Sequence, residues 1–99
     1  MANYRLTKPA LRDLEEIVTY LTREASALVS ERIEARLFDA FADLARLRVL
    51  GHRRLDVRRK GLLFYVADPY LIAFRREARG NVMIIRVLHG RRNVGGILR

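Results

Sequence analysis

The feature that most constrains the fold is a run of β-branched and long aliphatic residues near the C-terminal end of the chain. Residues 82–88 read VMIIRVL, and only Arg86 interrupts the apolar series. A run of this kind is typical of a strand that is buried on both faces of a sheet. We therefore expect residues 82–88 to form the central strand of the fold.

Cationic side chains follow this predicted strand directly. An arginine inside a buried strand must reach water or find a partner, and after Arg86 come His89, the turn residue Gly90, Arg91 and Arg92. We expect these side chains to gather at the end of the strand as a binding site. Two other interpretations stay open, namely that Arg86 braces the sheet through carbonyls or an acidic side chain, and that His89 caps the turn.

The positive charge is concentrated in the second half of the chain. The formal net charge is +9; residues 1–50 hold eight basic and eight acidic side chains, whereas residues 51–99 hold twelve basic and three acidic. Eighteen of the twenty cations are arginines, whose planar donors suit carboxylates, phosphates and base edges. This pattern indicates an anionic partner, a nucleic acid or an acidic protein surface; the alternative is a solvated arginine-rich surface.

The length of 99 residues suits one domain over residues 1–99. The chain has no cysteine and only two histidines, far apart, so we expect no disulfide, no metal and no cofactor. No apolar run approaches the roughly 20 residues that span a bilayer, and the N-terminus lacks the apolar core of a signal peptide. We expect a cytoplasmic protein without a membrane partner.

The first half of the chain predicts a short strand and two helices. Residues 4–7 alternate as a strand does, Thr7 is a candidate N-cap, and a helix is expected from about Lys8. A second helix of about twenty residues is predicted after Ser26 as its N-cap, with Gly51 as the left-handed residue beyond its end. One apolar stripe of the first helix is expected to face the core: Leu11, Leu14, Ile17, Val18 and Leu21.

The second half predicts three strands. Residues 62–67, 70–76 and 82–88 are strand-like and are separated by short turns, which implies an antiparallel meander. Residues 52–61 carry five cations with little periodicity and are predicted to be a loop, either a binding loop or a flexible linker. The second face of the sheet is apolar too, so the C-terminal tail, a partner protein or self-association must cover it, and the glycine-rich tail itself is expected to be mobile.

The predicted fold class is α+β, with an N-terminal strand, an antiparallel helical hairpin and a three-stranded antiparallel meander, in the order β-α-α-β-β-β. The first strand can reach the meander only by a crossover through the helical hairpin. This topology places the helices together, apart from the three consecutive strands.

In this order of elements and in the sequence of several stretches, the chain resembles the toxins of the RelE/ParE superfamily from bacterial type II toxin–antitoxin modules. The resemblance is greatest to the ParE branch. The stretches are YRLT at 4–7, ALRDLEEI at 10–17, YLIAFR at 70–75 and IIRVLHGRRN at 84–93. The resemblance covers nearly the whole chain, and the last stretch is the most specific.

The resemblance implies a growth-inhibiting toxin that forms a hetero-oligomer with a ParD-like antitoxin. ParE-like toxins are associated with the poisoning of DNA gyrase, whereas RelE-like toxins cut messenger RNA on the ribosome. An inactive or purely autoregulatory binding module is a further alternative. The target-binding residues expected here are Arg86, His89, Arg91, Arg92, Arg58 and Arg59.

A nuclease reading assigns catalysis to Arg86, His89 and Arg91. RNA cleavage by a 2′-hydroxyl needs a base, an acid and cations for the phosphorane charge. The chain has no tyrosine after Asn93, and Lys60 is the only lysine beyond Lys8. The catalytic set therefore looks incomplete, which favours gyrase inhibition.

Overall fold

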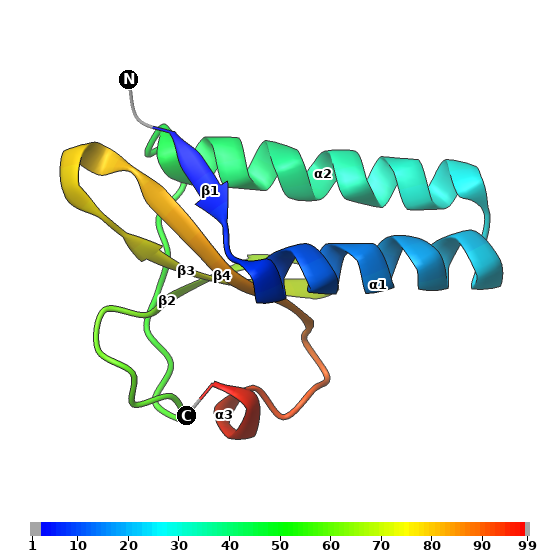
Figure 1. Cartoon of the computed structure of the whole chain (residues 1–99). Helices are drawn as coiled ribbons and strands as arrows, with labels where there is room; N and C mark the ends of the chain where they lie inside the picture. Colours follow the sequence, from blue (N-terminus) through cyan, green and yellow to red (C-terminus); the bar gives the residue numbers. More distant parts are fainter. Residues whose placement is uncertain (1–2, 99) are drawn as a thin grey trace.

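The computed structural model describes residues 3–98 and confirms the α+β class and the predicted order of its main elements (Figure 1). The elements are β1 (Tyr4–Leu6), α1 (Lys8–Glu24), α2 (Ala27–Ala45), β2 (Leu63–Ala67), β3 (Tyr70–Arg76), the 3₁₀ turn η1 (Ala78–Gly80), β4 (Val82–His89) and α3 (Val94–Ile97). Within residues 3–98, no helix combines the length and the apolar character needed to cross a membrane.

The sheet has the strand order β1-β4-β3-β2, so β4 lies in its interior as predicted. β4 pairs antiparallel with β3, and β3 pairs antiparallel with β2, which gives the predicted meander. β1 pairs parallel with β4 at the edge of the sheet, with Tyr4 opposite Val82. The parallel pair requires the crossover that the two helices supply.

The two helices begin where their caps predict. The backbone N–H of Ala10 donates to the Thr7 hydroxyl at 3.2 Å, and that of Val29 donates to the Ser26 hydroxyl at 3.1 Å. α1 and α2 lie side by side on one face of the sheet (Figure 1). The core between these layers contains Leu37, Phe41, Leu44, Ile72, Phe74 and Ile84, among others.

The predicted core stripe of α1 is only partly correct. Ala10 and Leu14 are buried in the core, but Leu11 is 48 % exposed. At about 100° per residue, Leu11 lies roughly a quarter turn away from Ala10, and it faces the space between the two helices instead. The spacing of apolar residues three and four positions apart predicted the helix correctly, but it assigned too many of its residues to the core-facing stripe.

The second face of the sheet is covered by the chain itself. Val94 and Leu98 are each 2 % exposed and pack with Phe64, Leu71 and further residues of a second apolar cluster. In Figure 1, α3 lies on the side of the sheet opposite α1 and α2. The tail therefore covers this face, which was one of the three alternatives predicted from the sequence. The expectation of a mobile tail is wrong, because the apolar residues Val94 and Leu98 are buried.

The end of α2 differs from the prediction as well. The helix ends at Ala45, and Leu47, not Gly51, takes the left-handed conformation, with φ of 58°. The N–H of Arg48 donates to the Asp43 carbonyl at 2.9 Å and that of Leu47 to the Leu44 carbonyl at 3.3 Å, which together form a Schellman motif. Gly51 lies instead against the buried Phe74 ring, where no side chain fits.

Replacing Leu47 by glycine is expected to stabilise the fold by roughly 0.5–1 kcal/mol. A left-handed conformation costs a residue with a Cβ about 1–2 kcal/mol, and glycine avoids this cost. The greater conformational freedom of glycine in the unfolded chain offsets part of the resulting stabilisation. Leu47 is 61 % exposed, so little packing is lost. Urea unfolding measures the change, and Gly51→Ala, which overpacks the Phe74 ring, is the opposing control; a destabilised Leu47→Gly variant would contradict this account.

Candidate functional site

Arg86 is held by an acidic side chain from the first helix. Its Nε donates to Asp13 Oδ2 at 2.7 Å and its Nη2 donates to Asp13 Oδ1 at 2.9 Å, a bidentate pair. The same carboxylate accepts the N–H of Val87 at 2.9 Å. The hydrogen bond to Asp13 raises the pKa of Arg86. The bracing interpretation of Arg86 is thus confirmed, with Asp13 as the partner that joins α1 to β4.

A polar hollow of about 290 Å³ opens beside this ion pair, at the end of β4. Two carboxylates, two phenol rings, an imidazole and one guanidinium contribute to its walls. The lining residues are Asp13, Glu16, Ile17, Tyr20, Tyr70, Val87, His89 and Arg92. Two of the predicted site residues, His89 and Arg92, therefore share one small cavity with the braced end of the sheet.

His89 is tied into the turn that follows β4. Its Nδ1 accepts the N–H of Arg91 at 3.2 Å, and its ring packs edge-on against Tyr70 with 5.7 Å between the ring centroids. An accepting Nδ1 leaves the proton of the neutral imidazole on Nε2. In this geometry His89 caps the turn through Nδ1. Its other ring nitrogen, Nε2, is a hydrogen-bond donor when the ring is neutral.

Tyr70 is a buried phenol whose ionisation is disfavoured. Its residue is 7 % exposed, and burial, followed by the neighbouring Tyr20, raises the pKa of its hydroxyl above the ordinary value of 10.0. The neutral phenol, a hydrogen-bond donor and acceptor, is therefore the form present in the hollow near neutral pH.

The stability of the fold is expected to fall as pH rises above about 10, the ordinary pKa of tyrosine. Above that pH the unfolded chain loses the Tyr70 proton while the folded chain keeps it, so deprotonation stabilises the unfolded state relative to the folded state until the folded pKa is passed. Ultraviolet titration of phenolate absorbance should show a late step that Tyr70→Phe removes. A late step that persists unchanged in Tyr70→Phe would refute this assignment.

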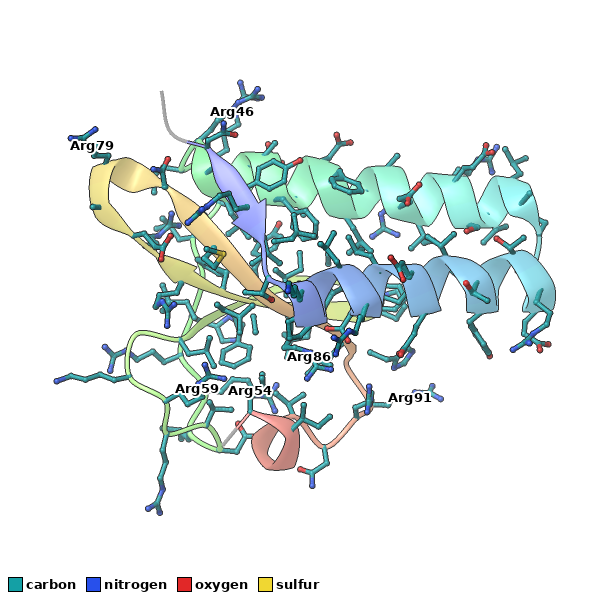
Figure 2. The ribbon with its side chains drawn as sticks, in the orientation of Figure 1. Arg46, Arg54, Arg59, Arg79, Arg86 and Arg91 are labelled. Atoms are coloured by element: carbon teal, nitrogen blue, oxygen red, sulfur yellow. The ribbon has the colours of Figure 1, made fainter. Side chains whose placement is uncertain are left out.

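Arg91 and Arg92 are exposed after the end of β4 and make no ion pair with any residue between 3 and 98. Arg92 lines the hollow beside His89, and Arg91 projects outward from the segment before α3 (Figure 2). These two guanidinium groups are therefore available to an anionic partner, in contrast to that of Arg86.

Arg58 and Arg59 lie on a different surface. They belong to the loop between α2 and β2 and line a separate hollow of about 380 Å³. Figure 2 shows Arg59 and Arg91 extending on opposite sides of α3. The six predicted site residues thus lie in three places: the end of β4, the turn that follows it, and the loop between α2 and β2.

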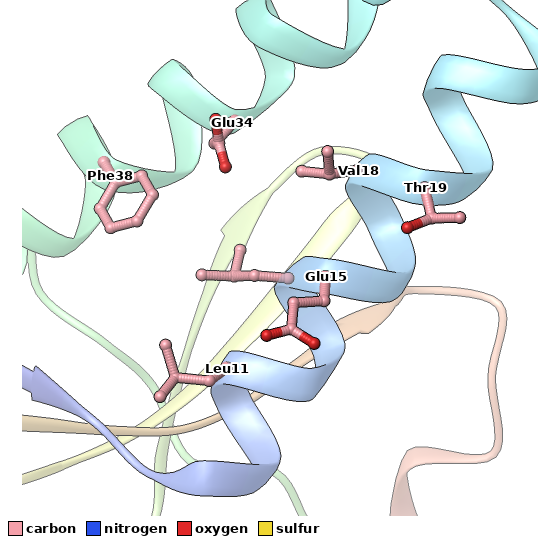
Figure 3. Close-up of a pocket in the computed structure, with 7 residues that line it drawn as sticks. Leu11, Glu15, Val18, Thr19, Glu34 and Phe38 are labelled. Carbon is pink, nitrogen blue, oxygen red and sulfur yellow. The ribbon is translucent and has the colours of Figure 1, made fainter.

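A third concave surface lies between the two long helices. A groove of about 390 Å³ has apolar walls that include Leu11, Val18 and the ring of Phe38, and the carboxylates of Glu15 and Glu34 stand beside them (Figure 3). Leu11 and Phe38 are 48 % and 36 % exposed. This groove is an apolar surface that no segment within residues 3–98 covers.

Sequence reasoning missed Asp13 and Glu16, which bring carboxylates to the strand end, and Tyr20. Asp13 shows a usable signal, because it stands between Ala10, Leu14 and Ile17 on the buried face of α1. An acidic residue among core positions requires a partner, and Arg86 is the matching charge. Among residues 3–98, no group of three or more potential ligands is arranged to hold a metal ion.

Two solved structures similar to this chain are of toxin–antitoxin assemblies. One is the chromosomal ParDE toxin–antitoxin system from P. aeruginosa, with a TM-score of 0.73 and 15 % identity, covering 90 % of this chain and 95 % of that one. Another is the toxin–antitoxin complex RelBE2 from Mycobacterium tuberculosis, with a TM-score of 0.63 and 27 % identity, covering 89 % and 96 %. Among curated proteins, none matches. The fold is thus one that occurs in toxin–antitoxin assemblies.

The family model of the ParE toxin of the type II toxin–antitoxin system parDE matches residues 4–94. The chain belongs to this ParE toxin family. The match runs from β1 to the first residue of α3, and it includes the braced strand end, the cationic loop and the groove between the helices.

Proposed function

We propose that this ParE-type toxin inhibits bacterial growth by poisoning DNA gyrase, and that a ParD-like antitoxin neutralises it. The match of the ParE toxin family over residues 4–94 is the observation that carries the proposal. Gyrase works on chromosomal DNA, so the proposal assigns the protein to the cytoplasm. In this proposal the protein acts by binding to gyrase and catalyses no reaction itself.

In this proposal Arg91 and Arg92 make the main contacts with the target. Their exposure and lack of ion pairs within residues 3–98 leave both guanidinium groups free to bind carboxylates or phosphates. Arg86 and His89 position them, because Asp13 fixes Arg86 in β4 and His89 Nδ1 fixes the N–H of Arg91. Arg58 and Arg59 extend the cationic surface beyond α3.

The ParD-like antitoxin is proposed to cover the groove between α1 and α2. An uncovered apolar groove favours association, and apolar side chains of an amphipathic segment suit the walls made by Leu11, Val18 and Phe38. Glu15 and Glu34 would pair with basic residues on that segment. Both similar structures named above are of toxin–antitoxin pairs, which supports a hetero-oligomer.

Messenger RNA cleavage on the ribosome is the second candidate, since RelBE2 is 27 % identical to this chain. The strand end suits it less well. Asp13 neutralises Arg86, His89 Nδ1 is occupied by the N–H of Arg91, and Glu16 adds a second carboxylate to the same hollow. A base needs a free acceptor and a phosphate needs cations, so these residues favour binding over catalysis. A purely autoregulatory binding module is the remaining candidate.

Two assays with the purified protein separate these candidates. In a gyrase supercoiling assay we expect stalled supercoiling and linearised DNA, and in a coupled translation assay we expect intact messenger RNA. Cut messenger RNA with unaffected gyrase would overturn the proposal in favour of ribosome-dependent cleavage. No effect in either assay, with tight binding to a neighbouring gene's product, would overturn it in favour of the binding module.

A further inference from the structure

The loop between α2 and β2 concentrates positive charge more densely than any other stretch of the chain. Over residues 53–60 it carries five cations and a single acid, Asp56. Together with three apolar residues the cations line one hollow of about 380 Å³, formed by Arg53, Arg54, Leu55, Val57, Arg58, Arg59, Lys60 and Leu62.

One of the five cations holds the loop together, and four remain for a ligand. Arg54 donates to both carboxylate oxygens of Asp56 at 2.9 Å, and its guanidinium lies 5.8 Å from the centroid of the Phe64 ring. This pairing raises the pKa of Arg54 and lowers the pKa of Asp56. The other four, Arg53, Arg58, Arg59 and Lys60, are exposed and form no ion pair with residues 3–98.

The loop is fastened to the rest of the fold at several points. His52 exchanges two backbone hydrogen bonds with Phe64, each of 2.8 Å. Val57 packs against the second apolar cluster of the sheet, and α3 lies so close that a Cβ on Gly95 would come within 2.8 Å of the Asp56 carbonyl. The cations are therefore presented by a tethered loop, and less conformational entropy is lost when they bind a ligand.

The tip of the loop is an apolar side chain in the middle of these cations. Leu55 has a relative exposure of 104 %, between the paired Arg54 and Asp56. Many proteins that bind the minor groove of DNA combine cationic side chains, which neutralise phosphates or enter the groove, with apolar side chains such as leucine that insert between base steps. Leu55 and its neighbours have this combination, whereas a purely solvated loop gains nothing from an exposed leucine.

We propose that residues 53–60 form a binding site for the phosphate backbone of duplex DNA, with Leu55 entering the adjoining groove. Four unpaired cations on one short loop match a polymer that carries about one negative charge per 1.7 Å of axis. The hollow has no aromatic residue in its wall, which disfavours single strands that bind by base stacking. The biological setting rests on the proposed function, in which gyrase holds DNA beside the toxin.

The test measures binding of the full chain to a fluorescein-labelled 20-base-pair duplex, used here as a probe of about two helical turns, by anisotropy over a salt series. Four phosphate contacts predict a slope of log K against log salt of about −3.6, and Arg58→Ala/Arg59→Ala/Lys60→Ala should reduce it to about −0.9. Leu55→Ala should weaken binding without changing the slope, because it removes no charge. Circular dichroism confirms that each variant is folded.

The matched control is Arg12→Ala/Arg23→Ala/Arg32→Ala, which removes the same charge from exposed positions on α1 and α2. It should keep most of the slope. Equal loss in both triple variants, no binding of the unmodified chain to the duplex, or stronger competition by polyglutamate than by unlabelled duplex would each overturn the inference. The assay contains no gyrase, so its failure leaves the supercoiling result standing, and failed gyrase inhibition leaves DNA binding measurable.

Discussion

Replacing Asp13 by alanine is expected to lower the free energy of unfolding by about 3–5 kcal/mol, the usual cost of removing one partner of a buried ion pair. The Asp13 side chain is 6 % exposed and that of Arg86 is 23 % exposed. The substitution leaves the Arg86 guanidinium and the N–H of Val87 without their shared acceptor. Domains of this size are stable by only about 5–15 kcal/mol, so the substitution removes a large fraction of the total stability.

Urea unfolding followed by circular dichroism measures this loss. Glu15→Ala is the matched control, because Glu15 is an exposed carboxylate on the same helix, and it should change stability by less than about 0.5 kcal/mol. In Asp13→Leu/Arg86→Met no buried charge remains, so most of the lost stability should return. A change below about 1 kcal/mol in Asp13→Ala would show that the pair does not join α1 to β4 as described.

The double substitution Arg91→Ala/Arg92→Ala is expected to weaken gyrase inhibition at least about tenfold, which corresponds to 1.4 kcal/mol of lost contact. Both side chains are exposed and make no ion pair within residues 3–98. Their removal therefore takes away contacts with a target and breaks no ion pair within residues 3–98. Growth inhibition in cells that express the variant should fall correspondingly, while thermal unfolding stays close to that of the unmodified protein.

Arg23→Ala/Arg32→Ala removes the same charge from exposed positions on α1 and α2 and serves as the control for net charge. It should retain growth inhibition. Full growth inhibition by Arg91→Ala/Arg92→Ala, at equal expression, would remove these arginines from the proposed target contact.

Local patterns predicted the elements well because the forces that define them act over a few residues. Thr7 and Ser26 cap their helices through hydroxyls that lie three residues from the N–H groups they accept. The apolar series of residues 82–88 and the turn signals around it likewise placed β3 and β4 nearly to the residue. Each of these signals is complete within a short window of the sequence.

Pairings across the fold were not predictable in the same way. Asp13 and Arg86 are 73 positions apart, and they meet only because α1 crosses from β1 back over β4. The C-terminal tail shows the same limit. Its glycines at positions 95 and 96 predict mobility, and only the three-dimensional structure shows the apolar cluster in which Val94 and Leu98 are buried. Leu47 in a left-handed conformation contradicts the local preference for glycine, and the Schellman bonds of Leu47 and Arg48 hold it there.

Trapping of covalent gyrase–DNA complexes by the purified protein tests the proposed mode of action. Gyrase, supercoiled plasmid and ATP are incubated with the protein, and the complexes are denatured with detergent and digested with protease. The account predicts linear plasmid in proportion to the protein added, and little of it with Arg91→Ala/Arg92→Ala. Plasmid that stays circular at every protein concentration, while growth inhibition in cells persists, would contradict it.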